Sequence, residues 1–321
     1  MSILVFAEGD NNSFKKSSFE AISYGKDLAN KKGTECIAVT IGPKGDENLG
    51  KFGADKVVNL EGDIFNSFNP QAYGKALAEV ANNEGADVII ISQTYSGKSL
   101  APIAAVKNGA ALVTGVIDMA DVSDGLKVRK TCFSNKAIAE VSVSHDKSVL
   151  TLIPNSYKIN EDGSEAASSQ ESVSVTDADI NSTIESVNKE TGKIPLTEAE
   201  LVVSAGRGLK GPENWTMIQE LADALGAATA CSKPVSDMEW RPHSEHVGQT
   251  GITIKPNLYI AVGISGAIQH LAGVGSSKVI CVVNTDPEAP FFKAADYGIV
   301  GDAFEVVPKL LKRVKELKGQ A

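Results

Sequence analysis

The stretch from Leu258 to His270 reads LYIAVGISGAIQH, and its pattern indicates the fold class. The apolar run Leu258–Val262 predicts a strand buried on both faces of a parallel sheet. The small residues that follow predict a tight turn, and Gly266–Ala272 predicts a helix. A buried strand, a glycine turn and a helix form the repeating unit of a parallel α/β domain.

The same alternation extends over the last third of the chain, after Pro195. We expect strands at Leu201–Ser204, Ala227–Ala230, Val279–Asn284 and Gly298–Asp302. Helices are expected at Glu213–Leu225 and Val306–Lys318, with Pro308 in the first turn of the latter. A second α/β domain is therefore predicted over residues 195–321.

The first half alternates in the same way. Strands are expected at Ile3–Ala7, Cys36–Ile41, Lys56–Leu60, Asp87–Ile91 and Ala111–Val113. Helices are expected at Ser17–Asn30, Gln71–Asn82 and Leu100–Lys107, with Tyr95–Leu100 as a loop before the last. The runs Leu126–Cys132, Ala137–Val143 and Val149–Ile153, separated by turn residues, predict added antiparallel strands. The predicted fold is α/β, with two Rossmann-like domains built on parallel sheets.

Residues 160–192 are rich in Ser, Glu, Asp and Thr and nearly lack large apolar side chains. Such a segment cannot bury enough surface for a core of its own. We interpret it as a connection between an N-terminal domain, residues 1–190, and the C-terminal domain. Val173–Val175 could add an edge strand.

Composition excludes several classes of protein. With 42% hydrophobic and 22% charged residues in 321, the chain is an ordinary globular protein. Its 31 basic and 40 acidic residues give a net charge of −9, which disfavours a nucleic-acid partner. The four cysteines are far apart and form no zinc motif. The opening run MSILVFAEGD is too short for a membrane span and lacks signal-peptide features, so we expect a cytoplasmic protein.

Gly206–Gly211 matches the pattern G-x-G-x-x-G after a predicted strand. Its glycines would let the backbone approach a pyrophosphate, and Arg207 suits a phosphate or carboxylate. The acidic residue of an NAD fingerprint is not evident, and a flexible strand–helix loop remains an equal alternative.

In the Gly263–His270 turn, backbone N–H groups and the Ser265 hydroxyl suit a phosphate, and His270 could reach a ligand's polar edge. A nucleophile elbow is disfavoured because position 267 is Ala rather than Gly, and a purely structural turn remains an alternative.

Val247–Gly251 could lay Gln249 and Thr250 along a planar ring, or form a plain polar hairpin. Asn284 and Asp302, at strand ends, could contact ribose or adenine, or serve as turn and cap residues.

Two further motifs are dismissed. Ser96–Ser99 has the end of a P-loop, but Ser92 stands where its first glycine belongs. His243 and His246 are spaced as H-x-x-H but lack a third ligand, so a solvated loop is favoured over a metal site.

Taken together, SAGRG (Ser204–Gly208), VGQTG (Val247–Gly251), the 258–273 stretch and NTDPEAPFFKAADYGIVGD (Asn284–Asp302) resemble the α subunit of electron transfer flavoprotein. The resemblance implies an FAD held mainly by the C-terminal domain and a heterodimer with a β subunit that carries AMP. It implies an electron carrier without substrate chemistry of its own, which accepts electrons from flavin dehydrogenases such as acyl-CoA dehydrogenases of fatty acid β-oxidation. A quinone oxidoreductase would receive them.

The resemblance also implies the cofactor contacts. Arg207 would lie near the flavin or diphosphate, and the Thr250 hydroxyl near ring N5. His270 would approach the C2 carbonyl, and Asn284, Asp302 and Ala303 the adenosine. The remaining implied contacts are Ser232, Lys233, Val247, Gly248, Gln249, Gly251, Ser265, Gly266, Ala267, Ile268 and Gln269.

Lys233 departs from the family, in which many members carry an arginine after this serine. Lysine is a hydrated point charge without the planar fork of arginine, so we expect a differently tuned flavin potential. As cations beside the ring, His270 and Lys233 would favour its reduced, more negative state. The alternatives are an NAD- or FAD-dependent oxidoreductase acting directly on a small substrate, and a nucleotide-binding sensor without redox chemistry.

Overall fold

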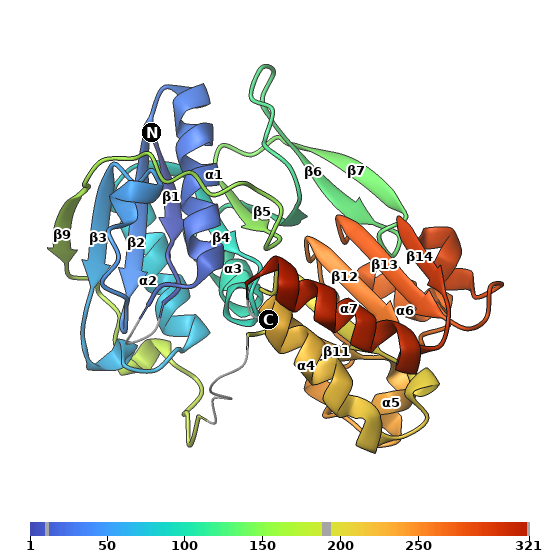
Figure 1. Cartoon of the computed structure of the whole chain (residues 1–321). Coiled ribbons are helices and arrows are strands. Elements are labelled where there is room, and N and C mark those ends of the chain that lie inside the picture. The colour runs from blue at the N-terminus through green and yellow to red at the C-terminus, as the bar shows by residue number, and fades with distance from the viewer. Residues whose placement is uncertain (10–12, 188–193, 320–321) are drawn as a thin grey trace. The chain divides into compact units, whose positions relative to one another are not determined.

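The computed structural model describes residues 1–9, 13–187 and 194–319. The chain divides into two compact units, one of residues 1–132 and 138–189 and the other of residues 133–137 and 190–321. Both are layered α/β structures with parallel sheets (Figure 1), so the predicted fold class is confirmed.

The sheet of the first unit has the strand order β7-β6-β5-β8-β4-β1-β2-β3-β9. All pairs from β5 to β9 in this order are parallel, and β6 joins β5 in the antiparallel direction. The strands are β1 (Ser2–Phe6), β2 (Glu35–Ile41), β3 (Lys56–Leu60), β4 (Ala86–Ser92), β5 (Ala111–Val116), β6 (Leu126–Cys132), β7 (Ala137–Val143), β8 (Ser148–Leu152) and β9 (Ala167–Glu171).

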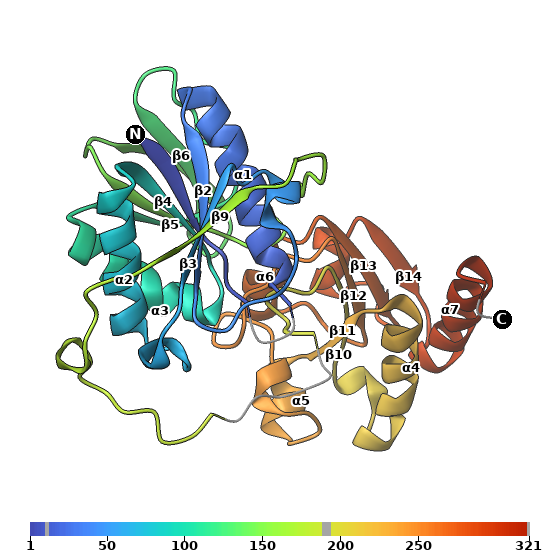
Figure 2. The same cartoon turned by 90° about the vertical axis from the view of Figure 1, so that its left-hand side faces the viewer.

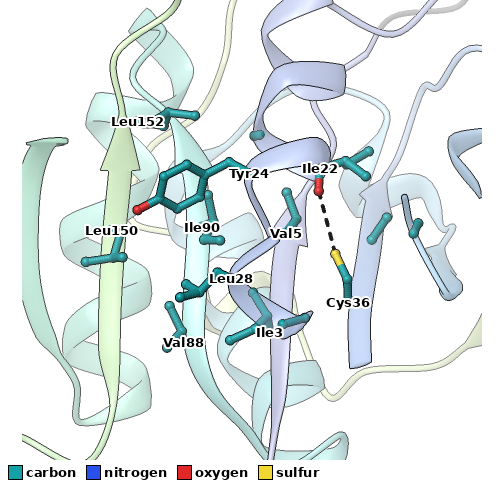
Figure 3. Packing of buried hydrophobic residues seen from close by; sticks show 14 of the residues in the cluster. Ile3, Val5, Ile22, Tyr24, Leu28, Cys36, Val88, Ile90, Leu150 and Leu152 are labelled. Carbon is teal, nitrogen blue, oxygen red and sulfur yellow. Dashed lines mark hydrogen bonds between the residues drawn. The ribbon is translucent and has the colours of Figure 1, made fainter. Parts of the chain in front are cut away.

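Three helices cover this sheet, α1 (Lys16–Lys32) on one face and α2 (Pro70–Asn83) and α3 (Tyr95–Asn108) on the other (Figure 2). Alternate residues of each strand point to opposite faces, so Ile3 and Val5 of β1 pack under α1. Figure 3 shows Tyr24 and Leu28 of α1 against Ile90 of β4 in this cluster. Leu4 and Phe6 point to the other core, beneath α2 and α3.

Three predictions for the first unit are wrong. The run at 149–153 forms β8, which lies between β4 and β5 and is parallel to both. Thr94 accepts a hydrogen bond from the Gly97 N–H, so α3 begins at Tyr95, where a loop was expected. The edge strand is β9 instead of Val173–Val175, because the valines of that segment pack their side chains against the core beneath α2.

The polar stretch 160–187 runs along the first unit, and residues 188–193 of the expected connection lie outside the described residues. The part from Ser174 to Asn181 pairs with polar side chains of α2. Lys75 and Asp179 form an ion pair of 2.8 Å, and the Ser174 N–H donates to the Glu79 carboxylate at 3.0 Å. Polar contacts, the pairing of β9 with β3 and the packing of Val173 and Val175 against the core together order a segment whose composition cannot supply a core of its own.

The second unit has a five-stranded, fully parallel sheet of order β11-β10-β12-β13-β14. The helices α4 (Thr216–Leu225) and α7 (Ala303–Leu317) pack on one face and α6 (Ile268–Val274) on the other, and a short α5 (Lys233–Asp237) follows β11. The strands are β10 (Leu201–Ala205), β11 (Ala228–Cys231), β12 (Leu258–Val262), β13 (Val279–Asn284) and β14 (Tyr297–Val300).

The start of α7 was predicted incorrectly. The Asp302 carboxylate accepts the Phe304 N–H at 3.0 Å and caps the helix, so Pro308 lies inside the helix and not in its first turn.

Candidate functional site

A cavity of about 710 Å³ lies in the second unit, at the carboxyl ends of β10 and β12. The strand order reverses there, because β11 lies on one side of β10 and the later strands lie on the other. Open α/β sheets bind ligands at this switch point. The lining residues are Gly206, Arg207, Gly208, Ser232, Lys233, Pro234, Asp237, His246, Val247, Gly248, Gln249, Thr250, Gly263, Ile264, Ser265, Ala267, Gln269, His270, Asn284, Asp286 and Ala289.

Most site residues predicted from the sequence line this one cavity, although they come from five separate segments. The five that do not line it are Gly251, Gly266, Ile268, Asp302 and Ala303. Asp302 caps α7 and Ala303 is the buried first residue of that helix, whereas the Ile268 side chain is exposed. Gly251 and Gly266 shape the backbone around the cavity, as described below.

The glycines of the Gly206–Gly211 motif let two loops pack backbone against backbone. A Cβ on Gly208 would lie 2.6 Å from the Gly263 Cα, so neither loop could keep its path with a larger residue there. The Gly208 N–H also donates to the Gly263 carbonyl at 3.1 Å. No long helix begins at this motif, because α4 starts only at Thr216.

Arg207 is an exposed residue of this motif. It lines the cavity and makes no ion pair with any described residue, so its guanidinium is available to a ligand. A free guanidinium beside loop N–H groups suits a phosphate or diphosphate.

The Gly248–Gly251 loop is clamped between His246 and α6. The Gln249 N–H donates to the Gln269 carbonyl at 2.7 Å, and a Cβ on Gly273 would lie 2.5 Å from the Gly248 nitrogen. A Cβ on Gly251 would lie 2.3 Å from the His246 carbonyl oxygen. The loop is held by its backbone, and the exposed side chains of Gln249 and Thr250 line the cavity.

The turn after β12 depends on Gly266. This residue has φ +80°, and a Cβ on it would lie 2.5 Å from backbone atoms of Phe291. The Phe291 N–H donates to the Ser265 carbonyl at 3.1 Å and fixes the turn. Ser265, Ala267 and Gln269 thereby reach the cavity wall.

His270 is buried, and its Nε2 lies 2.8 Å from the Tyr259 hydroxyl. Burial, and then the charge of neighbouring His246, lower the pKa of His270 to about 4, against a small opposing effect of the Val247 backbone. The ring is therefore neutral near pH 7. This corrects the expectation that His270 supplies a cation in the protein alone.

His246 is a lining residue that sequence reasoning missed, because it was interpreted as part of a solvated loop. It is 2% exposed, and burial is the main cause that lowers its pKa. A β-bridge to Cys231 places it beside the end of β11, and no local sequence pattern indicates this contact. No cluster of metal-ligating side chains occurs among the described residues.

Two charged side chains face each other on α5. The Lys233 Nζ lies 2.9 Å from Asp237 Oδ1, and both residues line the cavity. Asp237 was missed, although its i+4 spacing from Lys233 on a helix could have indicated it. Asn284 is tied to the backbone, because its amide donates to the Ile264 carbonyl at 3.0 Å.

The cavity thus offers an arginine, a lysine, loop N–H groups, three side-chain amides, three hydroxyls and two neutral imidazoles, together with the carboxylates of Asp237 and Asp286. This donor set suits a large ligand that carries a phosphate and a flat polar ring. Among the described residues, no helix is both long and apolar enough to span a bilayer.

Comparison with known proteins covers both halves of the chain. Residues 3–180 match the electron transfer flavoprotein domain, and residues 195–275 match the electron transfer flavoprotein FAD-binding domain. The chain is 38% identical to the electron transfer flavoprotein subunit alpha of Syntrophomonas wolfei, over 97% of this chain and 98% of that protein.

It is 36% identical to the protein of the same name from Bacillus subtilis, over 98% of each chain. It is 33% identical to the acryloyl-CoA reductase electron transfer subunit beta of Anaerotignum propionicum, over 98% of this chain and 96% of that protein. The chain therefore belongs to the electron transfer flavoprotein family and resembles its alpha subunits along its whole length.

Proposed function

We propose that this chain is the FAD-binding subunit of a heterodimeric electron carrier. The observation that carries the proposal is the cavity at the switch point of the second sheet, whose lining lies largely within residues that match an FAD-binding domain. Bound FAD would supply the redox chemistry, and the protein would set its position and electrostatics.

The residues present fit this cofactor. Arg207, which has no ion-pair partner among the described residues, and the turn from Ser265 to Gln269 would hold the diphosphate. Gln249 and Thr250 would lie along the ring, with the Thr250 hydroxyl as a donor to N5. His270 would approach the C2 carbonyl. Ser232 and Lys233 would contact the flavin, and Asn284 would face the adenosine end. Asp302 and Ala303 lie outside the cavity lining, so they would meet the adenosine only where it extends beyond the cavity.

The partners follow from the family. We infer a heterodimer with a β subunit that carries AMP, and a cytoplasmic carrier that takes electrons from flavin dehydrogenases such as acyl-CoA dehydrogenases. Electrons would pass on to a quinone oxidoreductase. The relative named as an electron transfer subunit of acryloyl-CoA reductase supports a donor or acceptor of the acyl-CoA class. The carrier would transform no substrate of its own.

The test is co-purification of the full chain with a co-expressed β subunit, followed by the visible spectrum and cofactor analysis. We expect a yellow protein with one FAD for each chain, reduced by an acyl-CoA dehydrogenase and its substrate. A colourless protein that binds only AMP or ATP would contradict the proposal. Turnover of NADH without a second protein would favour a direct oxidoreductase instead.

A further inference from the structure

Two buried side chains connect the second sheet to the cavity. Tyr259 lies on β12 and His270 on α6, with exposed fractions of 0% and 7%.

The contact between Tyr259 and His270 fixes the tautomer of the imidazole. The hydroxyl and Nε2 are 2.8 Å apart. A neutral imidazole has one N–H and one bare nitrogen, so either the phenol donates to Nε2 or Nε2–H donates to the phenol. A phenol O–H is the more acidic donor and a bare imidazole nitrogen the more basic acceptor, which favours donation from Tyr259.

Burial raises the pKa of Tyr259, so the phenol keeps its proton near pH 7 and can donate it to Nε2. The single proton of the neutral imidazole then remains on Nδ1.

Nδ1 is the polar atom left over. It is buried, and the Val247 backbone lies near enough to oppose the fall in the pKa of the ring. No acceptor among the residues that the structure describes meets Nδ1 with normal hydrogen-bond geometry. The ring that carries it lines the cavity. A buried N–H without an acceptor is costly, so a ligand acceptor placed there would be bound favourably.

We propose that Tyr259 is a positioning residue for His270, whose hydroxyl fixes the imidazole tautomer that presents Nδ1–H to an acceptor atom of the cavity's ligand. The proposal rests on the proposed function in one respect, that this ligand is FAD, whose ring carbonyl oxygens are acceptors. Tyr259 itself touches no ligand; it acts through the imidazole.

The first test reads the tautomer directly, without FAD. The full chain is labelled with ¹⁵N-histidine, and the ring nitrogens are recorded by NMR at pH 7, with His270 assigned from a His270→Gln variant. We expect a protonated Nδ1 and a bare Nε2 in the unchanged chain, and a mixture or the opposite tautomer in Tyr259→Phe. A proton on Nε2 in the unchanged chain, or an unchanged tautomer in Tyr259→Phe, would overturn the proposal.

The second test measures FAD affinity by flavin fluorescence. We expect Tyr259→Phe to weaken binding about five-fold, the effect of one misdirected hydrogen bond. Tyr73→Phe is the matched control, because the Tyr73 hydroxyl also donates one buried hydrogen bond, to the Phe65 carbonyl at 3.0 Å, but in the first unit. It should leave FAD affinity unchanged. A five-fold loss in both variants would show a general effect of destabilisation and would contradict the proposal.

The experiments distinguish failure of the proposed function from failure of the role assigned to Tyr259. If the unchanged chain binds no FAD, the proposed function fails, while the tautomer experiment still decides the role of Tyr259. Should Tyr259→Phe not fold, the tautomer of the unchanged chain decides alone, because a proton on Nε2 would show that the phenol does not donate to His270.

Discussion

At the scale of single residues, the cavity depends on glycines at positions where a neighbouring group leaves no room for a side chain. Gly208 faces the Gly263 backbone, and Gly251 faces the carbonyl and ring of His246. The sequence shows that these positions are glycines, but it does not show which groups lie beside them, because those groups come from distant segments. Most residues that line the cavity could be predicted from their motifs, whereas His246 could not.

The buried imidazole of His270 makes stability depend on pH. Its pKa is about 4 in the folded protein against 6.5 ordinarily, so between these values the unfolded chain binds more protons. Stability should fall as the pH falls from about 6.5 to 4, by up to about 3 kcal/mol, and change no further from this cause below pH 4. Urea unfolding at pH 7 and pH 4.5 checks this: His270→Gln should lose less stability than the unchanged chain. His145→Gln, at an exposed histidine, is the control, and equal losses in all three proteins would refute the assignment.

Lys233 and Asp237, which form an ion pair, should shift the flavin potential in opposite directions. Reduction adds negative charge, which a nearby cation stabilises and an anion opposes. We expect Lys233→Met to lower the potential of the bound FAD and Asp237→Asn to raise it, as measured by redox titration. Lys233→Arg keeps the charge and should still alter the potential through its planar geometry. Since the two side chains are 57% and 54% exposed, unchanged potentials in all three variants would mean that solvent screens the pair.

At the scale of elements, the strands were predicted more accurately than the helix starts. Strand positions follow from runs of apolar residues, as in β12, whose expected bounds match the structure. Helix starts depend on caps that resemble other turns. Thr94 was placed before a loop and Asp302 at the end of a strand, yet each side chain accepts an N–H of the first helical turn.

The Asp302 cap can be separated from a cofactor contact. Asp302→Ala removes the acceptor for the Phe304 N–H and should destabilise the second unit by about 1 kcal/mol. Asp302→Asn keeps an acceptor and should behave like the unchanged chain in thermal unfolding. If both variants instead lose FAD affinity at unchanged stability, Asp302 contacts the cofactor directly.

At the scale of the whole molecule, the fold class could be predicted but not the strand order. The alternation of strands and helices implies parallel sheets. Pairing between distant strands leaves no local pattern, so β8 was assigned to the antiparallel group although it lies between β4 and β5. The switch point between β10 and β12, which locates the cavity, becomes visible only once the order is known.

The two units should unfold separately, and FAD should stabilise one of them. Every lining residue of the cavity belongs to the second unit, so ligand binding adds free energy to that unit alone. We expect two unfolding transitions in calorimetry, and FAD should raise the midpoint temperature of one of them.

Two variants identify the transitions. Asp302→Ala should lower the midpoint temperature of the transition that FAD stabilises. Glu20→Gln should lower the other, because the Glu20 carboxylate accepts the N–H groups of Ser156 and Tyr157, both at 2.7 Å, within the first unit. A single transition that shifts in all cases would show that the units unfold together. Glu140→Gln, at an exposed carboxylate of β7, is the control and should move neither.

All residues that line the cavity lie within one stretch of chain, residues 206–289, so the proposed cofactor site is encoded separately from the first unit. Substitutions in the first unit therefore leave every residue that lines the cavity unchanged. Relatives could thus diverge in their choice of redox partners while the chemistry of the prosthetic group is inherited intact.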